Sequence, residues 1–157
     1  MKNTTLCYIE RDGAYLLLHR VKKVNDENRD KWIGVGGRFE ENESPEDCVF
    51  REALEETGLT LRAPRYCGIV TFVSDRWEGE YMHLFHAEDF TGELRDCDEG
   101  VLEWVPKEKV RSLPQWAGDQ IFLDLMERRV PFFSLKLRYE GERLVEAVLD
   151  GKPLPLY

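Results

Sequence analysis

Three glutamates, Glu52, Glu55 and Glu56, stand close together in the chain. On an α-helix, with about 3.6 residues per turn, positions i, i+3 and i+4 lie on one side, so the three carboxylates would share a helix face. Carboxylate oxygens are hard ligands that suit Mg²⁺ or Mn²⁺ better than zinc. A solvated acidic face explains the same spacing, because like charges on an exposed helix cost only about 0.2–0.5 kcal/mol per pair. The spacing permits a metal site without requiring one.

The residues around these glutamates carry start and stop signals for a helix. Ser44 is a good N-cap, and Pro45 follows at the first helical position, where its missing N–H costs nothing. Gly58 can take the left-handed conformation that ends a helix. We therefore predict a helix over 45–57.

Other side chains of this helix should fix it in place. Phe50 and Leu54 are four residues apart and point away from the glutamates, so we expect them to anchor the helix in the core. We interpret Arg51 and Glu43 as a structural ion pair that joins the preceding loop to the helix rather than as direct catalysts.

The whole stretch 37–59 resembles the Nudix box, the signature of the Nudix hydrolases. Its fixed positions are all filled, by Gly37, Glu43, Arg51, Glu52, Glu55, Glu56 and Gly58. The resemblance implies an α/β/α sandwich around a mixed sheet. It also implies that the helical glutamates, with the carbonyl group of Gly37 as an additional ligand, bind divalent metal for cleavage of a diphosphate linked to another group.

Length and composition favour a single enzyme domain over 1–157. The hydrophobic content of 42% excludes a disordered chain, and no apolar run approaches the roughly twenty residues of a membrane span. The net charge of -9 argues against a nucleic-acid polymer as partner, whereas a small anionic substrate can bind if metal ions supply positive charge. We expect a cytoplasmic protein; a monomer is compatible with the sequence, which leaves the oligomeric state open.

The four cysteines, Cys7, Cys48, Cys67 and Cys97, are widely scattered and show no paired metal-ligand spacing. We interpret them as buried or inert thiols in a reducing compartment and assign them no chemistry.

The remaining elements follow from apolar patterns and turn signals. Asp12 and Gly13 between apolar runs predict a hairpin. Strands are expected at 5–10, 14–20, 32–37, 66–74, 80–87, 101–105, 132–139 and 144–149, and helices at 106–113 and 118–129.

Positive charge gathers in and around a polar loop predicted over 22–31. Arg20 and Lys23 belong to this group, and Arg38 lies just after the glycines that precede the box. Each could meet substrate phosphates, and for each of them simple solvation is the alternative. Loops of about ten residues in compact domains tend to be mobile or functional.

Beyond the box, nearly the whole chain resembles MutT-type 8-oxo-dGTP diphosphatases, in the branch shared by some Gram-positive bacteria and vertebrates. The similarity lies in 31–38, in Asp98-Glu99 before a Leu-Glu-Trp-Val strand, in 116–119 and in 131–134. It implies that Trp116 and Asp119 hold a purine base. Vertebrate relatives have a base-contacting asparagine at the position of Ile33, which offers only apolar contact.

Physical chemistry supports this purine site but also allows a structural explanation. The indole ring of Trp116 can stack on a purine for roughly 1–3 kcal/mol, and the carboxylate of Asp119 can accept the two N–H donors on the Watson–Crick edge of guanine. Alternatively, Trp116 packs the second long helix, and Asp119 lies in its first turn to complement the helix dipole.

The expected reaction is hydrolysis of a nucleoside triphosphate to the monophosphate and pyrophosphate. Two or more Mg²⁺ ions, held by the box glutamates and Glu99, would orient and activate the attacking water. Asp98 and Glu103 are alternatives to Glu99, and Glu56 and Glu99 are both candidate general bases. There are two alternative functions: a Nudix hydrolase for another substrate, and a non-catalytic ligand-sensing module. Retention of every box glutamate disfavours the non-catalytic module.

Overall fold

The computed structural model describes residues 1–22 and 26–156. Within these ranges the chain forms, in order, β1 (Lys2–Arg11), β2 (Ala14–His19), β3 (Trp32–Ile33), α1 (Pro45–Thr57), β4 (Leu59–Arg62), β5 (Arg65–Ser74), β6 (Glu80–Ala87), β7 (Asp89–Gly92), β8 (Val101–Pro106), α2 (Lys107–Val110), α3 (Asp119–Glu127), β9 (Phe133–Glu140), β10 (Arg143–Leu149) and β11 (Lys152–Leu154).

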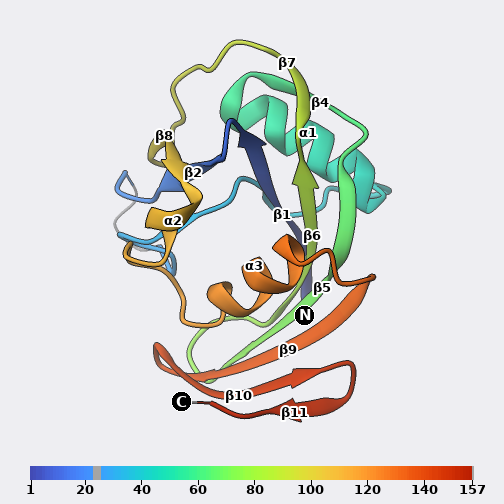
Figure 1. The fold of residues 1–157 in the computed structure, drawn as a ribbon, viewed down its shortest axis with the longest axis vertical. Coiled ribbons are helices and arrows are strands. Elements are labelled where there is room, and N and C mark those ends of the chain that lie inside the picture. Colours follow the sequence, from blue (N-terminus) through green and yellow to red (C-terminus); the bar gives the residue numbers. More distant parts are fainter. Residues whose placement is uncertain (23–25, 157) are drawn as a thin grey trace.

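A mixed sheet of nine strands runs through the molecule (Figure 1). Its order is β11-β10-β9-β5-β6-β1-β2-β3, and β8 also pairs with β2. β1 pairs with β6, and β5 pairs with β9, in parallel, while the other pairs are antiparallel. The predicted hairpin β1–β2 is confirmed, and β5–β6 and β9–β10 form two further antiparallel hairpins.

The two long helices cover opposite faces of this sheet. Successive side chains of a strand point to opposite faces, and β1 shows this alternation clearly. Leu6 and Tyr8 pack in the core beneath α3, whereas Cys7 and Ile9 pack in the core beneath α1. The α/β/α sandwich around a mixed sheet is therefore confirmed.

The helix α1 begins and ends where the sequence predicts. Ser44 caps its first turn through a hydrogen bond from the Asp47 N–H at 3.0 Å, and Gly58 ends it in the left-handed conformation with φ 81°. The prediction that Phe50 and Leu54 anchor the helix is wrong, because they are 38% and 46% exposed.

The buried side of α1 is instead the side that carries Glu56. Val49 and Ala53 are buried there against the sheet, and the carboxyl group of Glu56 is buried with them. The prediction failed because it assumed that the larger apolar residues face inward. The helix is rotated so that a glutamate enters the interior, and Phe50 and Leu54 turn outward as a consequence.

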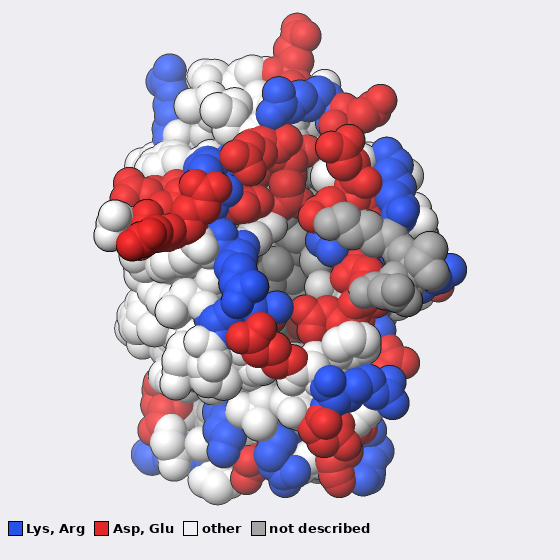
Figure 2. All heavy atoms as spheres, turned by 180° about the vertical axis from the view of Figure 1, so that it is seen from behind, with Lys and Arg blue, Asp and Glu red and all other residues white. Residues whose placement is uncertain are grey.

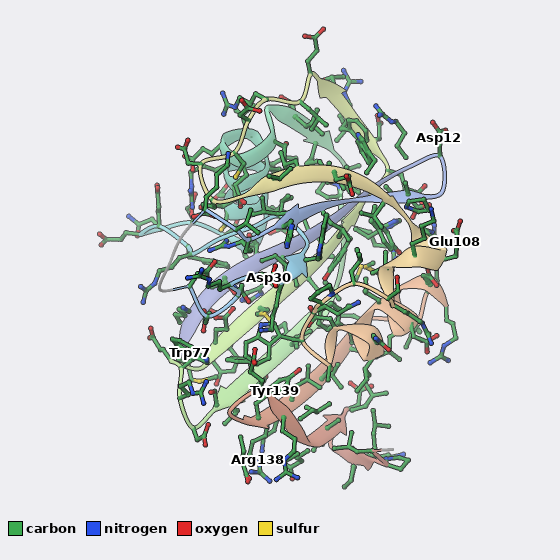
Figure 3. The ribbon with its side chains drawn as sticks, turned by 90° about the vertical axis from the view of Figure 1, so that its left-hand side faces the viewer. Asp12, Asp30, Trp77, Glu108, Arg138 and Tyr139 are labelled. Atoms are coloured by element: carbon green, nitrogen blue, oxygen red, sulfur yellow. The ribbon has the colours of Figure 1, made fainter. Side chains whose placement is uncertain are left out.

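The C-terminal strands β9, β10 and β11 extend the same sheet, at the bottom of the view in Figure 1. Tyr139 on β9 points inward and is 1% exposed, whereas its neighbour Arg138 points outward, as Figure 3 shows. The sequence did not indicate β11 or the small antiparallel sheet of β4 and β7. Each of these three strands has only three or four residues, too few for a clear alternating pattern.

All four cysteines are free and buried, as predicted. In the part of the chain that the structure describes, no helix is long and apolar enough to cross a bilayer.

Candidate active site

A cavity of about 280 Å³ lies between the N-terminal part of β1, the glycines after β3, the inner side of α1 and the start of α3. Charged side chains of both signs crowd around a hollow near the middle of the face shown in Figure 2. Glutamates of α1 lie at one end of the cavity, and the aromatic and apolar residues Phe72, Trp116, Leu137 and Tyr139 contribute to its lining elsewhere.

Glu56 enters the cavity from the buried side of α1 and is 7% exposed. Its Oε1 accepts a hydrogen bond from the Gly36 N–H at 2.9 Å, whereas its Oε2 is buried and has no hydrogen-bond partner among the described residues. Burial raises the pKa of Glu56 to about 8, and the Gly36 N–H only partly opposes the rise. Burying an oxygen without a hydrogen-bond partner is unfavourable unless a bound ligand interacts with it.

Glu52 lies one helical turn before Glu56 and also lines the cavity. Burial raises the pKa of its carboxyl group, although a hydrogen bond from Arg51 at 2.7 Å partly opposes the rise. Gly37 faces Glu52 so closely that a Cβ atom at position 37 would lie 2.5 Å from the Glu52 Cδ. A side chain at position 37 would therefore displace the Glu52 carboxyl group from its present position.

The carbonyl oxygen of Gly37, expected as an additional metal ligand, already accepts a hydrogen bond from the Thr5 N–H at 2.9 Å. The Sγ of Cys48 lies 3.6 Å from the same oxygen as a second, weaker donor, so a metal ion bound there would replace that contact. The structure thus leaves the Gly37 ligand as a prediction.

Arg51 ties the preceding loop to α1, as the sequence predicts. Its guanidinium group donates to both carboxylate oxygens of Glu43, at 2.7 and 2.9 Å, and to the carbonyl oxygen of Arg38 at 3.0 Å. The hydrogen bond from Arg51 lowers the pKa of Glu43 to about 2. This bidentate ion pair fixes the loop that carries Gly37 against the helix that carries Glu52.

Glu55 is more exposed than the other two helical glutamates. Its side chain is 57% exposed, it does not line the cavity, and it accepts a hydrogen bond from Arg51 at 3.2 Å. Its role as a metal ligand stays a prediction.

Glu99 reaches the cavity from the segment between β7 and β8, and its Oε2 accepts a hydrogen bond from Arg20 at 2.9 Å. Arg20 also donates to Asp26 at 2.6 Å. The guanidinium group of Arg20 therefore lines the cavity while bound to two carboxylates, which reduces its capacity to attract phosphate.

The other two predicted phosphate contacts differ in position. Arg38 lines the cavity, but its side chain is 67% exposed and lies 3.7 Å from Glu78. Lys23 lies outside the described residues.

Trp116 both packs the core and lines the cavity, so its structural and functional explanations are compatible. It is 6% exposed, and its ring meets Phe72 and Tyr139 edge-on at centroid distances of 5.4 and 4.9 Å. Its Nε1–H donates to the Oδ1 of Asn28 at 2.8 Å, and the Nζ of Lys31 lies 4.5 Å from the ring centre.

Asp119 is the first residue of α3 and is 5% exposed at the cavity wall. Burial raises its pKa to about 8, although the charge of Lys31 opposes the rise. A carboxyl group that only complements the helix dipole needs no burial, so its position favours contact with a ligand. Ile33 lines the same cavity and offers the apolar contact that its residue type predicts.

The charges around the cavity test whether divalent cations fit there. The lining contains the carboxyl groups of Glu27, Glu52, Glu56, Glu80, Glu99 and Asp119 and the cationic groups of Lys2, Arg20 and Arg38. This excess of carboxyl groups opposes a polyphosphate unless cations enter with it. The partnerless Oε2 of Glu56 offers such a cation a ligand, so the donor set fits Mg²⁺ or Mn²⁺.

The sequence did not reveal several residues that line the cavity, among them Asn28, Phe72, Glu80 and Tyr139. Phe72 and Tyr139 lie in strands, where their pattern is that of ordinary core residues. Asn28 lies in a polar loop without periodicity, and only its contact with Trp116 shows its place.

The fold and this glutamate-lined cavity are those of a Nudix hydrolase: the NUDIX domain family model matches residues 2–126, and the chain belongs to that family. It is 32% identical to the oxidized purine nucleoside triphosphate hydrolase of Danio rerio over 152 residues, which cover 95% of this chain and 94% of that protein. It is 31% identical to the CTP pyrophosphohydrolase of Escherichia coli (strain K12) over 113 residues, or 71% and 80% of the two chains.

The crystal structure of a mutator MutT protein from Bacillus halodurans matches with a TM-score of 0.85 and 28% identity, over 98% of this chain and all of that one. Together these similarities make the protein a MutT-type Nudix hydrolase. The structural match covers nearly the whole chain, whereas the family model ends at residue 126, before β9.

Proposed function

We propose that this enzyme hydrolyses oxidised purine nucleoside triphosphates, with 8-oxo-dGTP as the preferred substrate, to the monophosphate and pyrophosphate. The observation that carries the proposal is that Asp119 and Trp116 line the same cavity as the α1 glutamates. A purine bound beside Asp119 would extend its triphosphate toward Glu52 and Glu56.

The divalent cations would be held by Glu52, Glu56 and Glu99. Glu55 and the Gly37 carbonyl group would be further ligands. When bound, Mg²⁺ neutralises charge on the phosphate oxygens and lowers the pKa of the attacking water.

The chain's own residues bind and orient the substrate. The carboxyl group of Asp119, when ionised, accepts the N1–H and N2–H donors of guanine. Trp116 supplies an aromatic wall, held in orientation by Asn28. At the other end, Glu56 or Glu99 accepts a proton from the attacking water as the water oxygen bonds to phosphorus and the bond to the departing phosphate oxygen breaks.

The test compares kcat/KM for 8-oxo-dGTP and dGTP in Mg²⁺, with the products identified. A preference of tenfold or more for 8-oxo-dGTP, which corresponds to about 1.4 kcal/mol of transition-state discrimination, is expected. Asp119→Ala should erase most of the discrimination between guanine and pyrimidine nucleotides, whereas Asp124→Ala, an exposed change on the same helix, should retain it. Equal rates on both purines, or unchanged selectivity in Asp119→Ala, would refute the substrate assignment.

A second candidate is a Nudix hydrolase for another nucleotide. Ile33 provides only apolar contact where the vertebrate enzymes have a base-contacting asparagine, and one relative is named a CTP pyrophosphohydrolase. A rate on CTP far above that on 8-oxo-dGTP would select this alternative.

The setting of this activity is part of the proposal. We place the enzyme in the cytoplasm, because four free thiols fit a reducing compartment. We also propose that residues 1–157 act as one domain, since β9–β11 belong to the sheet that carries the site.

A further inference from the structure

Cys97 lies beside the carboxyl groups of Glu56 and Glu99 and is not part of the Nudix box. It is 4% exposed and precedes Glu99 by two residues. Its Sγ and one carboxylate oxygen each of Glu56 and Glu99 all lie within 4.8 Å of one another. The backbone at this point is fixed, because the carbonyl oxygen of Cys97 accepts a hydrogen bond from the Nζ of Lys22 at 2.7 Å.

A second observation indicates that this group of atoms can receive a ligand. Glu56 is 7% exposed, and its Oε2 is buried without a hydrogen-bond partner among the described residues. Burial of an unpaired carboxylate oxygen is unfavourable, and a cation relieves the cost. The donor set differs from that of a magnesium site because it contains sulfur.

We propose that Glu56, Cys97 and Glu99 form a binding site for one thiophilic divalent cation of the zinc and cadmium class. Thiolate sulfur favours such ions, whereas Mg²⁺ takes oxygen ligands. On binding, the S–H bond of Cys97 breaks, the proton passes to solvent and a metal–sulfur bond forms, without any change of oxidation state.

The geometry requires only small adjustments. Zinc bonds of about 2.0–2.3 Å in a tetrahedron bring pairs of ligand atoms to within about 3.3–3.8 Å. The three donors, within 4.8 Å of one another, are therefore close to that arrangement. A water molecule can supply the fourth position, as in sites with three protein ligands.

This cation would compete with the magnesium of the proposed function, because both need Glu56 and Glu99. The inference concerns metal binding alone and does not depend on which nucleotide the enzyme cleaves. Its test therefore uses metal-free, reduced protein without substrate.

The experiment titrates the protein with Cd²⁺ and follows the ultraviolet charge-transfer absorption of a cadmium–sulfur bond. We expect the band to saturate at one equivalent. Glu10, His86 and Glu88 form another group of potential ligands, but it contains no sulfur, so binding there would not contribute to the band. Mg²⁺ at one hundred times its own Kd should raise the apparent Kd for Cd²⁺ about a hundredfold.

Three cysteine variants separate this site from the others. Cys97→Ser should remove the band and reduce the ratio of Cd²⁺ to Mg²⁺ affinity at least tenfold. Cys67→Ser is the matched control, because Cys67 is also buried and free but does not belong to this group of potential metal ligands, and it should retain both properties. Persistence of the band in Cys97→Ser, its loss in Cys48→Ser, or indifference to Mg²⁺ would overturn the proposal.

A measurement on the unaltered protein guards against a variant that fails to fold. The ¹¹³Cd NMR shift distinguishes a site with one sulfur ligand from a site with oxygen ligands alone. A shift in the sulfur-containing range is expected, and an oxygen-only shift at one equivalent would refute the assignment whatever the variants do.

Discussion

Replacing Asp119 by asparagine should make the free enzyme more stable at neutral pH while impairing base recognition. Asp119 is 5% exposed, and burial raises its pKa from 3.8 to about 8. Asparagine has nearly the same shape and no charge at any pH. The variant therefore removes the energetic cost of a buried ionisable group without creating a cavity.

The direction of the pH effect follows from proton binding. Below pH 3.8 the carboxyl group is protonated in both folded and unfolded protein, so the substitution alters no ionisation cost. Between pH 3.8 and about 8 the unfolded chain loses the proton while the folded protein keeps it, and the parent loses stability as pH rises. Above about pH 8 both states are ionised, and the difference between parent and variant becomes constant.

The magnitude follows from the same titration. Each pKa unit corresponds to about 1.4 kcal/mol, so over the two pH units from pH 5 to pH 7 the free energy of unfolding of Asp119→Asn should gain roughly 3 kcal/mol at most on the parent. Other ionisable groups affect parent and variant alike, so they cancel in the difference. Urea unfolding at pH 5, 6, 7 and 8 measures this difference.

Asp124→Asn is the control for this experiment. Asp124 lies on the same helix, its side chain is 45% exposed, and its ion pair with Arg128 spans 3.0 Å at the surface. The difference between parent and this variant should change by less than about 0.5 kcal/mol over the same pH range. A difference for Asp119→Asn that is constant from pH 5 to pH 7 would refute the conclusion that the carboxyl group is held protonated.

Three further substitutions test other parts of the site. Glu56→Gln removes a charged ligand and should reduce turnover at saturating Mg²⁺ more than tenfold; turnover within threefold of the parent would show that the metal assignment is wrong. Gly37→Ala places a Cβ 2.5 Å from the Glu52 Cδ, so kcat/KM should fall more than tenfold, and parent-like kinetics would disprove the close fit. Asn28→Leu leaves the buried Nε1–H of Trp116 without its acceptor, at a cost of about 1–3 kcal/mol, and should raise KM more than it lowers kcat; an unchanged KM would refute the orienting role.

Local signals predicted the elements that carry the site. Ser44 and Gly58 set the ends of α1 through capping interactions within a few residues, which a sequence reveals directly. The rotation of α1 about its own axis depends on what the sheet and the glycines around Gly36 present to it. For that reason the sequence indicated a shared face for the glutamates but not that Glu56 is buried and Glu55 exposed.

Long-range contacts explain the other differences. Trp116 and Asn28 are 88 residues apart, and no local pattern predicts their hydrogen bond. The hydrogen bond from Arg20 to Glu99 likewise joins residues 79 positions apart. A basic residue near a predicted phosphate site can therefore bind carboxylates of the protein instead of phosphate. Composition alone does not distinguish these two cases.

The two ends of the cavity have the same electrostatic character. Glu56 and Asp119 are both buried, and burial raises the pKa of each to about 8. In the proposed function, a cation would relieve Glu56, and the N–H donors of a guanine base would relieve Asp119. A metal–nucleotide complex would satisfy both ends at once, whereas a nucleotide with a different base edge would leave Asp119 buried without its partners. On this view, the cost of the two buried carboxyl groups in the free enzyme is what lets the cavity discriminate between substrates, because only a matching ligand removes it completely.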